Sequence, residues 1–163
     1  MQLTVEQFTE QFKHHIRVLL DYDALTRHDE IAINTGYRNL KEMSDYYCPW
    51  YYNGKRYSCI PEEIINDASY RAIHLSQGAN FPETVEYIKK RRTYPKKLWP
   101  VPIMTDLATH QTLLLDGNHI MSTLVHYEKF EQNIPVCEVA GRDLSDVLID
   151  FEFLKRSVGV HHE

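Results

Sequence analysis

Apolar side chains recur every three or four positions in several stretches of this chain, which is the spacing of one face of an α-helix. The first such stretch, 4–20, opens with Thr4 and Gln7 in a capping-box arrangement. The same spacing predicts further helices over 38–47, over 61–78 with Pro61 at its start, from Pro82 through Val85 and Ile88, over 118–131, and from Asp143 or Ser145 through Val147, Leu148, Phe151 and Leu154.

Three shorter apolar runs, bounded by turn residues, predict β-strands at 99–104, 112–115 and 134–139. Pro100 and Pro102 lack a backbone N–H for a sheet ladder, so the first of these runs is predicted as an edge strand. The order of elements is then helices, a hairpin, helices and β–β–α–β–α, which predicts a mixed α/β or α+β domain.

The hairpin is predicted from Asn-Gly at 53–54, because this dipeptide tolerates the positive φ angles of a type I′ turn. A two-residue turn there sets Trp50 opposite Tyr57 and Cys48 opposite Cys59. A disulfide between those two cysteines is geometrically conceivable. Two reduced, packed thiols are favoured, since the third cysteine makes the number odd and argues against a disulfide framework.

Length and composition indicate one domain over 1–163, because 163 residues with 43% hydrophobic content suffice for a core. We divide it into a helical region at 1–80, with a β-hairpin at 50–57, and a core at 82–156. No apolar run approaches the length of a membrane span, and no basic-then-apolar signal pattern opens the chain. These features predict a cytoplasmic protein without a membrane partner; its oligomeric state stays open.

The formal charge of −5 gives no general reason to expect a polyanion as partner. The charge is uneven, however, since six basic residues lie within 89–97: Lys89, Lys90, Arg91, Arg92, Lys96 and Lys97. This basic cluster either forms a solvated helix end or attracts nucleic acid. The aromatic residues near the hairpin allow the same two interpretations, as core or as a stacking platform for bases: Tyr46, Tyr47, Trp50, Tyr51, Tyr52 and Tyr57.

The strongest chemical signal is the passage of the apolar run 113–115 directly into Asp116, Gly117, Asn118 and His119. A strand that turns tightly into a helix directs backbone N–H groups and an imidazole toward one spot, which suits an anion such as phosphate. In that interpretation His119 is a phosphate ligand or general acid–base, and Asp116 holds Mg²⁺. The alternative is a plain tight turn with an Asx bond and a helix N-cap.

The stretch that contains "WPVPIM", "LLLDGNHIMSTLV" and "IPVCEV", roughly residues 82–140, resembles the ParB/sulfiredoxin superfamily. The central motif of that superfamily reads Asp-Gly-Asn-His-Arg or Asp-Gly-His-His-Arg, and it opens a helix that binds nucleotide or other phosphates. The resemblance implies a small mixed sheet in a ParB/sulfiredoxin-like core at 82–156. It also implies a nucleotide (ATP or CTP) and Mg²⁺ as cofactors, with phosphoryl transfer or nucleotide hydrolysis as the reaction.

Carried onto this chain, the resemblance makes His119 and Asp116 catalytic, Asp116 the metal ligand, and Gly117, Asn118 and His119 the phosphate-binding residues. The motif arginine is replaced by Ile120, so a substitute cation is needed, with Arg142, Arg91 and Arg92 as candidates. Sulfiredoxins have their catalytic cysteine at the position of Asn118, which argues against that reductase chemistry here. A carboxylate for a kinase reaction could come from Glu62 or Glu63, although both also suit a helix start.

Two alternatives from other functional classes stand beside nucleotide binding. One is a nucleic-acid-binding protein or nuclease that uses Lys89, Lys90, Arg91 and Arg92 together with the tyrosines. It predicts salt-sensitive binding to DNA or RNA. The other is a non-catalytic protein-interaction domain that has kept the fold and lost the chemistry, as Ile120 suggests.

Overall fold

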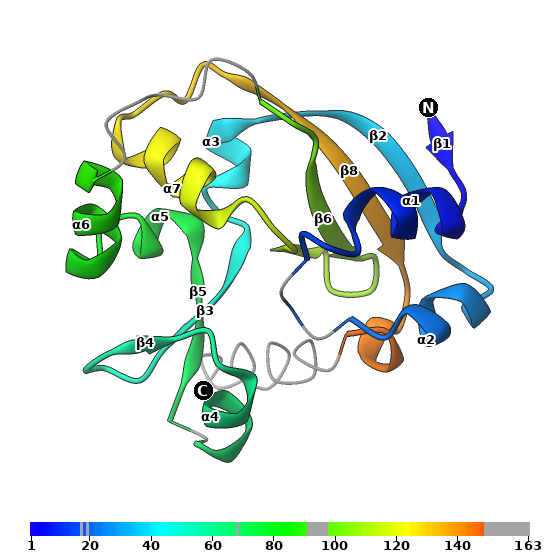
Figure 1. The fold of residues 1–163 in the computed structure, drawn as a ribbon, viewed down its shortest axis with the longest axis horizontal. Helices are drawn as coiled ribbons and strands as arrows, with labels where there is room; N and C mark the ends of the chain where they lie inside the picture. Colours follow the sequence, from blue (N-terminus) through cyan, green and yellow to red (C-terminus); the bar gives the residue numbers. More distant parts are fainter. Residues whose placement is uncertain (17, 19, 68, 91–97, 149–163) are drawn as a thin grey trace.

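The computed structural model describes residues 1–16, 18, 20–67, 69–90 and 98–148, and these form one mixed eight-stranded sheet with helices on both sides (Figure 1). The strands run in the order β1-β2-β8-β6-β7-β3-β4, and β5 pairs with β3. Their bounds are β1 Gln2–Leu3, β2 Ala32–Asn39, β3 Tyr47–Tyr52, β4 Tyr57–Ser58, β5 Arg71–His74, β6 Val101–Asp106, β7 Gln111–Leu114 and β8 Asn133–Gly141. The helices are α1 Val5–Phe12, α2 Tyr22–Arg27, α3 Leu40–Met43, α4 Pro61–Asn66, α5 Leu75–Gly78, α6 Pro82–Lys90, α7 Asn118–His126 and the short 3₁₀ helix η1 Leu144–Asp146.

Two hydrophobic clusters cover the two faces of the central strands. On one face Phe8 and Leu25, from α1 and α2, pack with Val139 of β8. On the other, Met121 and Leu124 of α7 pack with strand residues of β6 and β8. Figure 1 shows α1 and α2 on one side of these strands and α3, α5, α6 and α7 on the other. The mixed α/β class predicted from the sequence is therefore confirmed.

The predictions closest to the motif agree with the structure. The strand expected at 112–115 is β7, the helix expected from 118 is α7, and the strand expected at 134–139 is β8. The helix predicted from Pro82 is α6, with Ile88 buried and Val85 half-buried. Only the end of α7 differs, since the helix stops at His126 rather than at 131.

The two helices predicted nearest the amino end are shorter than expected. The capping box of Thr4 is present, with its Oγ1 3.3 Å from the Gln7 N–H, but α1 ends at Phe12. Leu20 instead forms an isolated antiparallel bridge with Leu148, which requires extended backbone within the predicted 4–20 helix. The helix predicted over 38–47 is reduced to α3, because β2 and β3 take up the residues on either side.

The long helix predicted over 61–78 is wrong, since this segment forms α4, β5 and α5 in succession. Residues 71–74 extend to pair antiparallel with β3, which places Ile73 opposite Cys48 and His74 opposite Tyr47. The pairing partners lie 19 to 27 positions earlier, so they left no trace in the local spacing. As a result, the segment 1–80 is not purely helical and supplies β1 to β5 of the sheet.

The edge position predicted for the 99–104 run is also wrong, because β6 lies between β8 and β7 in the middle of the sheet. Pro102 is accommodated there because its carbonyl accepts the Leu115 N–H at 2.9 Å. The N–H and C=O of one strand residue point to the same side, so the missing donor of Pro102 faces a position just beyond the end of β7. The proline therefore removes one bond, the reciprocal one to the Leu115 carbonyl, at the end of the β6–β7 pairing.

The hairpin at 50–57 forms with a longer loop than predicted. Tyr52 pairs with Tyr57, so residues 53–56 form the loop and Cys48 does not oppose Cys59. All three cysteines are free thiols, with Cys48 buried and Cys59 exposed rather than packed.

Two predictions fall partly beyond the part of the chain that the structure describes. The last helix was expected to include Phe151 and Leu154, which lie outside the described residues, and its start appears as η1 after Asp143. Residues 91–97 of the basic cluster also lie outside them. In the described part, no helix is both long and apolar enough to span a membrane.

Candidate functional site

The Asp116–His119 motif forms the predicted tight junction between β7 and α7. Gly117 has φ +83°, in the left-handed region that a residue with a Cβ adopts only at a cost, so glycine suits this position for conformational reasons. The Met121 N–H makes the first helical bond, to the Gly117 carbonyl at 2.9 Å. The chain therefore passes from strand to helix through three residues, 115–117.

The amino end of α7 is left open by this turn. Its N-cap residue is Gly117, which has no side chain, and no side-chain hydrogen bond caps the helix. The helix's own bonds begin with Met121, so the amides of 118–120 are directed toward the mouth of the helix. This end also carries the positive pole of the helix dipole, so the local field favours negative charge.

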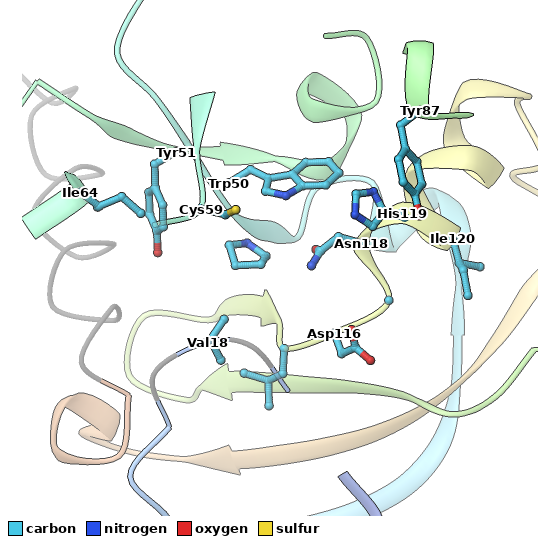
Figure 2. Close-up of a pocket in the computed structure, with 13 residues that line it drawn as sticks. Val18, Trp50, Tyr51, Cys59, Ile64, Tyr87, Asp116, Asn118, His119 and Ile120 are labelled. Carbon is cyan, nitrogen blue, oxygen red and sulfur yellow. The ribbon is translucent and has the colours of Figure 1, made fainter. Parts of the chain in front are cut away.

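A pocket of about 880 Å³ opens at this helix end (Figure 2). Its size lies within the range of small-molecule and cofactor sites, about 300–1,000 Å³. Six separate segments contribute to its wall. The lining residues are Val18, Pro49, Trp50, Tyr51, Cys59, Ile64, Tyr87, Leu115, Asp116, Gly117, Asn118, His119 and Ile120.

Three aromatic rings form one wall of the pocket. The exposed His119 imidazole stacks on the Tyr87 ring of α6, with centroids 4.0 Å apart and planes 26° apart. On its other side the Trp50 ring of β3 lies 5.4 Å away at 53°. Figure 2 shows His119 between these two rings. The imidazole therefore belongs to an array of flat surfaces and faces solvent.

Trp50 is held in place by close packing against a helix backbone. A Cβ built at Gly78 of α5 would lie 2.9 Å from Trp50 Cε3, so only glycine leaves room for the indole. The Tyr57 ring packs 5.9 Å from the other side. Trp50 is 5% exposed, which makes it a fixed part of the wall rather than a mobile cover.

Asn118 projects its amide toward the middle of the pocket (Figure 2). Its Oδ1 is fully shielded from solvent and accepts no hydrogen bond from any described residue. A buried polar atom without a partner costs about 1–3 kcal/mol, so this oxygen is a ready acceptor for a ligand donor.

Asp116 also lines the pocket and is half-buried. Within the described residues, no three His, Cys, Asp or Glu side chains gather into a metal-binding group. The site therefore offers one carboxylate at this point, which does not make a protein-built Mg²⁺ site.

The structure does not bring Arg142 to the motif. Gly117 lies against Val101, and Val101 pairs with Val136 in the first half of β8. Arg142 follows Gly141 at the far end of that strand, about 20 Å away at about 3.3 Å per residue. The prediction that Arg142 replaces the motif arginine at this pocket is therefore wrong, and Arg91 and Arg92 lie outside the described residues.

The other predicted candidates lie outside the pocket. Lys89 and Lys90 are exposed at the end of α6, with the Lys90 ammonium 2.8 Å from Glu86. Glu63 accepts the Ser58 hydroxyl at 2.8 Å and lies 3.2 Å from Arg56, so it has structural partners. Of the six aromatic residues near the hairpin, only two line the pocket, Trp50 and Tyr51.

Sequence reasoning missed several lining residues, namely Tyr87, Cys59, Ile64 and Val18. Tyr87 reaches the site because α6 packs beside α7, a contact between helices that no local pattern encodes. Cys59 follows β4 and reaches the wall through the hairpin.

Comparisons of the chain with protein-family models, curated proteins and solved structures found no match in any of the three.

Proposed function

We propose that this chain is a ParB/sulfiredoxin-like nucleotide-binding protein whose ligand occupies the pocket at the amino end of α7. The order β6-β7-α7-β8, with Asp-Gly-Asn-His at the β7–α7 junction, supports the resemblance. One observation carries the proposal. An open helix mouth, an aromatic wall and the shielded, unpartnered Oδ1 of Asn118 meet in a single pocket of about 880 Å³.

The phosphate group lies at the mouth of α7 in this proposal. The amides of 118–120 supply hydrogen bonds, and the helix dipole adds about 0.3–1 kcal/mol for a negative charge. His119 contributes a ring nitrogen at the same end. Gly117 lets the backbone come close to the ligand, because it has no Cβ.

The base lies on the aromatic wall. The exposed His119 ring, supported by Trp50 and Tyr87, is the part of this wall that a base can reach, and stacking on an aromatic side chain contributes about 1–3 kcal/mol per base. The Asn118 oxygen then accepts a hydrogen bond from an amino or hydroxyl group of the nucleoside. A bare phosphate would use the helix mouth alone, so the wall is what favours a nucleotide.

The proposal concerns binding, because the described lining holds no lysine or arginine to offset the charge that develops in phosphoryl transfer. Ile120 occupies the place of the motif arginine and lines the pocket as an apolar side chain. The binding test is run with and without Mg²⁺, because Asp116 is the one carboxylate in the described lining of the pocket that could coordinate the ion.

The test uses the two tryptophans of the chain, Trp50 and Trp99. In a Trp99→Phe background, Trp50 is the single indole and lines the pocket. We expect saturable changes in its fluorescence on titration with ATP, CTP or GTP, with and without Mg²⁺. Adenosine, titrated alone, measures binding to the aromatic wall. Inorganic phosphate, titrated alone, measures binding at the helix mouth.

Protection of Cys59 from iodoacetamide gives a second readout, since this thiol is exposed and lines the same pocket. His119→Ala removes a stacking surface and a phosphate contact, so we expect nucleotide affinity to fall about tenfold, equal to about 1.4 kcal/mol. His126→Ala, in the last turn of the same helix, is the matched control and should leave affinity unchanged. Absence of both a Trp50 response and Cys59 protection with every nucleotide would overturn the proposal.

A further inference from the structure

A second, smaller hollow lies beside the same turn and is formed by different elements. Its volume is about 430 Å³. One wall comes from Phe12 at the end of α1 and from His15 just after it, and another comes from the segment 98–102. Asp116 and Met121 close it on the α7 side. The nucleotide proposal uses none of the α1 or 98–102 residues.

Most of this lining is apolar and fixed in the core. Met121 is fully buried, and Phe12 and Val101 are each 5% exposed. At the rim, the Trp99 indole is 72% exposed, the most exposed of the large aromatic side chains described. An apolar hollow with an exposed indole at its rim is a surface on which a flat apolar group loses contact with water.

One charged group faces this apolar lining. Among the described residues that form the hollow, Asp116 is the single carboxylate and none is lysine or arginine. Its side chain is half-buried and makes no hydrogen bond or ion pair with any described residue. A carboxylate in this position attracts a cation with hydrogen-bond donors more strongly than an exposed one does, because less water screens it.

We propose that this hollow binds a small organic cation, an amine with a compact apolar or aromatic body. The ammonium donates to the Asp116 carboxylate, and the apolar body packs between Phe12, Met121 and the Trp99 indole. The indole face also attracts the positive charge itself. This site is separate from the nucleotide pocket, although the two share the turn at Asp116 and Gly117.

Charge and size together select this ligand class. An anion of the same shape would place its charge beside the Asp116 carboxylate, which is repulsive. A neutral molecule would gain the apolar contacts and leave the carboxylate unpartnered. A volume of about 430 Å³ suits a small molecule, near the lower end of the range of about 300–1,000 Å³ for ligand pockets.

The test titrates the full chain at pH 8 with three probes of matched shape: phenethylammonium, 2-phenylethanol and phenylacetate. The two indole N–H resonances report the two hollows separately, with the Trp99→Phe variant assigning each one. We expect phenethylammonium to shift the Trp99 resonance and to bind about tenfold tighter than 2-phenylethanol, a ratio typical of a charge-assisted hydrogen bond. Phenylacetate should bind most weakly.

Asp116→Asn keeps the shape of the side chain and removes its charge. We expect it to reduce the preference for the amine over the alcohol to less than about twofold, while Asp146→Asn, at an exposed position of η1, leaves the preference intact. Trp99→Ala, measured by calorimetry because this variant lacks the reporting indole, should weaken the binding of all three probes and keep their order, which tests the site without altering the turn. Equal binding of the three probes, or a shift of the Trp50 resonance alone, would overturn the proposal. Neither result bears on nucleotide binding, which Trp50 and Cys59 report independently.

Discussion

Replacing Gly117 with alanine tests the backbone geometry on which the β7–α7 junction depends. The φ angle of +83° lies in the left-handed region, where a Cβ costs about 1–2 kcal/mol. Sterically the position is open, because the added Cβ would meet the nearest atoms, the Val101 methyl groups, at 3.5 and 3.6 Å, which is ordinary van der Waals contact. The whole cost is therefore conformational.

The net magnitude follows from two opposing terms. Alanine also restricts the unfolded chain, which returns about 0.4–1 kcal/mol to the folded state. We expect Gly117→Ala to lower the free energy of unfolding by about 1 kcal/mol, or the Tm by about 2–4 °C for a chain of this size. Urea denaturation, followed by far-UV circular dichroism, measures the difference.

Gly54 provides a matched control, since its φ is +89° and nothing lies within 4 Å of an added Cβ. The Gly54→Ala variant should lose a similar free energy, within about 0.5 kcal/mol of Gly117→Ala. Only Gly117→Ala should also weaken the Trp50 response to nucleotide, because any relaxation of φ turns the amides of 118–120. An unchanged stability of Gly117→Ala alongside a destabilised Gly54→Ala would refute the left-handed geometry of the junction.

Three further predictions concern the cysteines and the packing of Trp50. Burial raises the pKa of the Cys137 thiol from its ordinary value of 9.0 to about 11, so at pH 8 iodoacetamide should modify Cys59 and leave Cys137 intact, as peptide mass mapping would show. Because the folded-state pKa is the higher one, this group's contribution to stability is complete below pH 9 and declines up to about pH 11, which urea titrations at both pH values should detect. Gly78→Ala should destabilise the fold by roughly 1–2 kcal/mol and shift Trp50 emission, since the new Cβ would lie 2.9 Å from the indole; unchanged emission and stability would show that the indole is not confined there.

Local signals in the sequence determined much of the structure around the site. Gly117, followed by residues at helical spacing, was enough to place a strand, a tight turn and a helix, because positive φ is a local property of the backbone. The Thr4 capping box and Pro82 fixed where α1 and α6 begin, for similarly local reasons. Helix ends and strand neighbours were not determined in this way.

Tertiary contacts decided the remainder. Residues 71–74 became a strand because β3 offered hydrogen-bonding partners, although their apolar spacing also fits a helix. The pocket unites Trp50, Tyr87 and His119, which are separated by more than thirty positions in each case. Pairing of β6 with β8 carried Arg142 to the opposite end of the sheet. The spacing of residues along the chain specifies which faces of helices and strands are apolar. Packing between distant segments decides which of these faces meet, and the binding site forms only where they do.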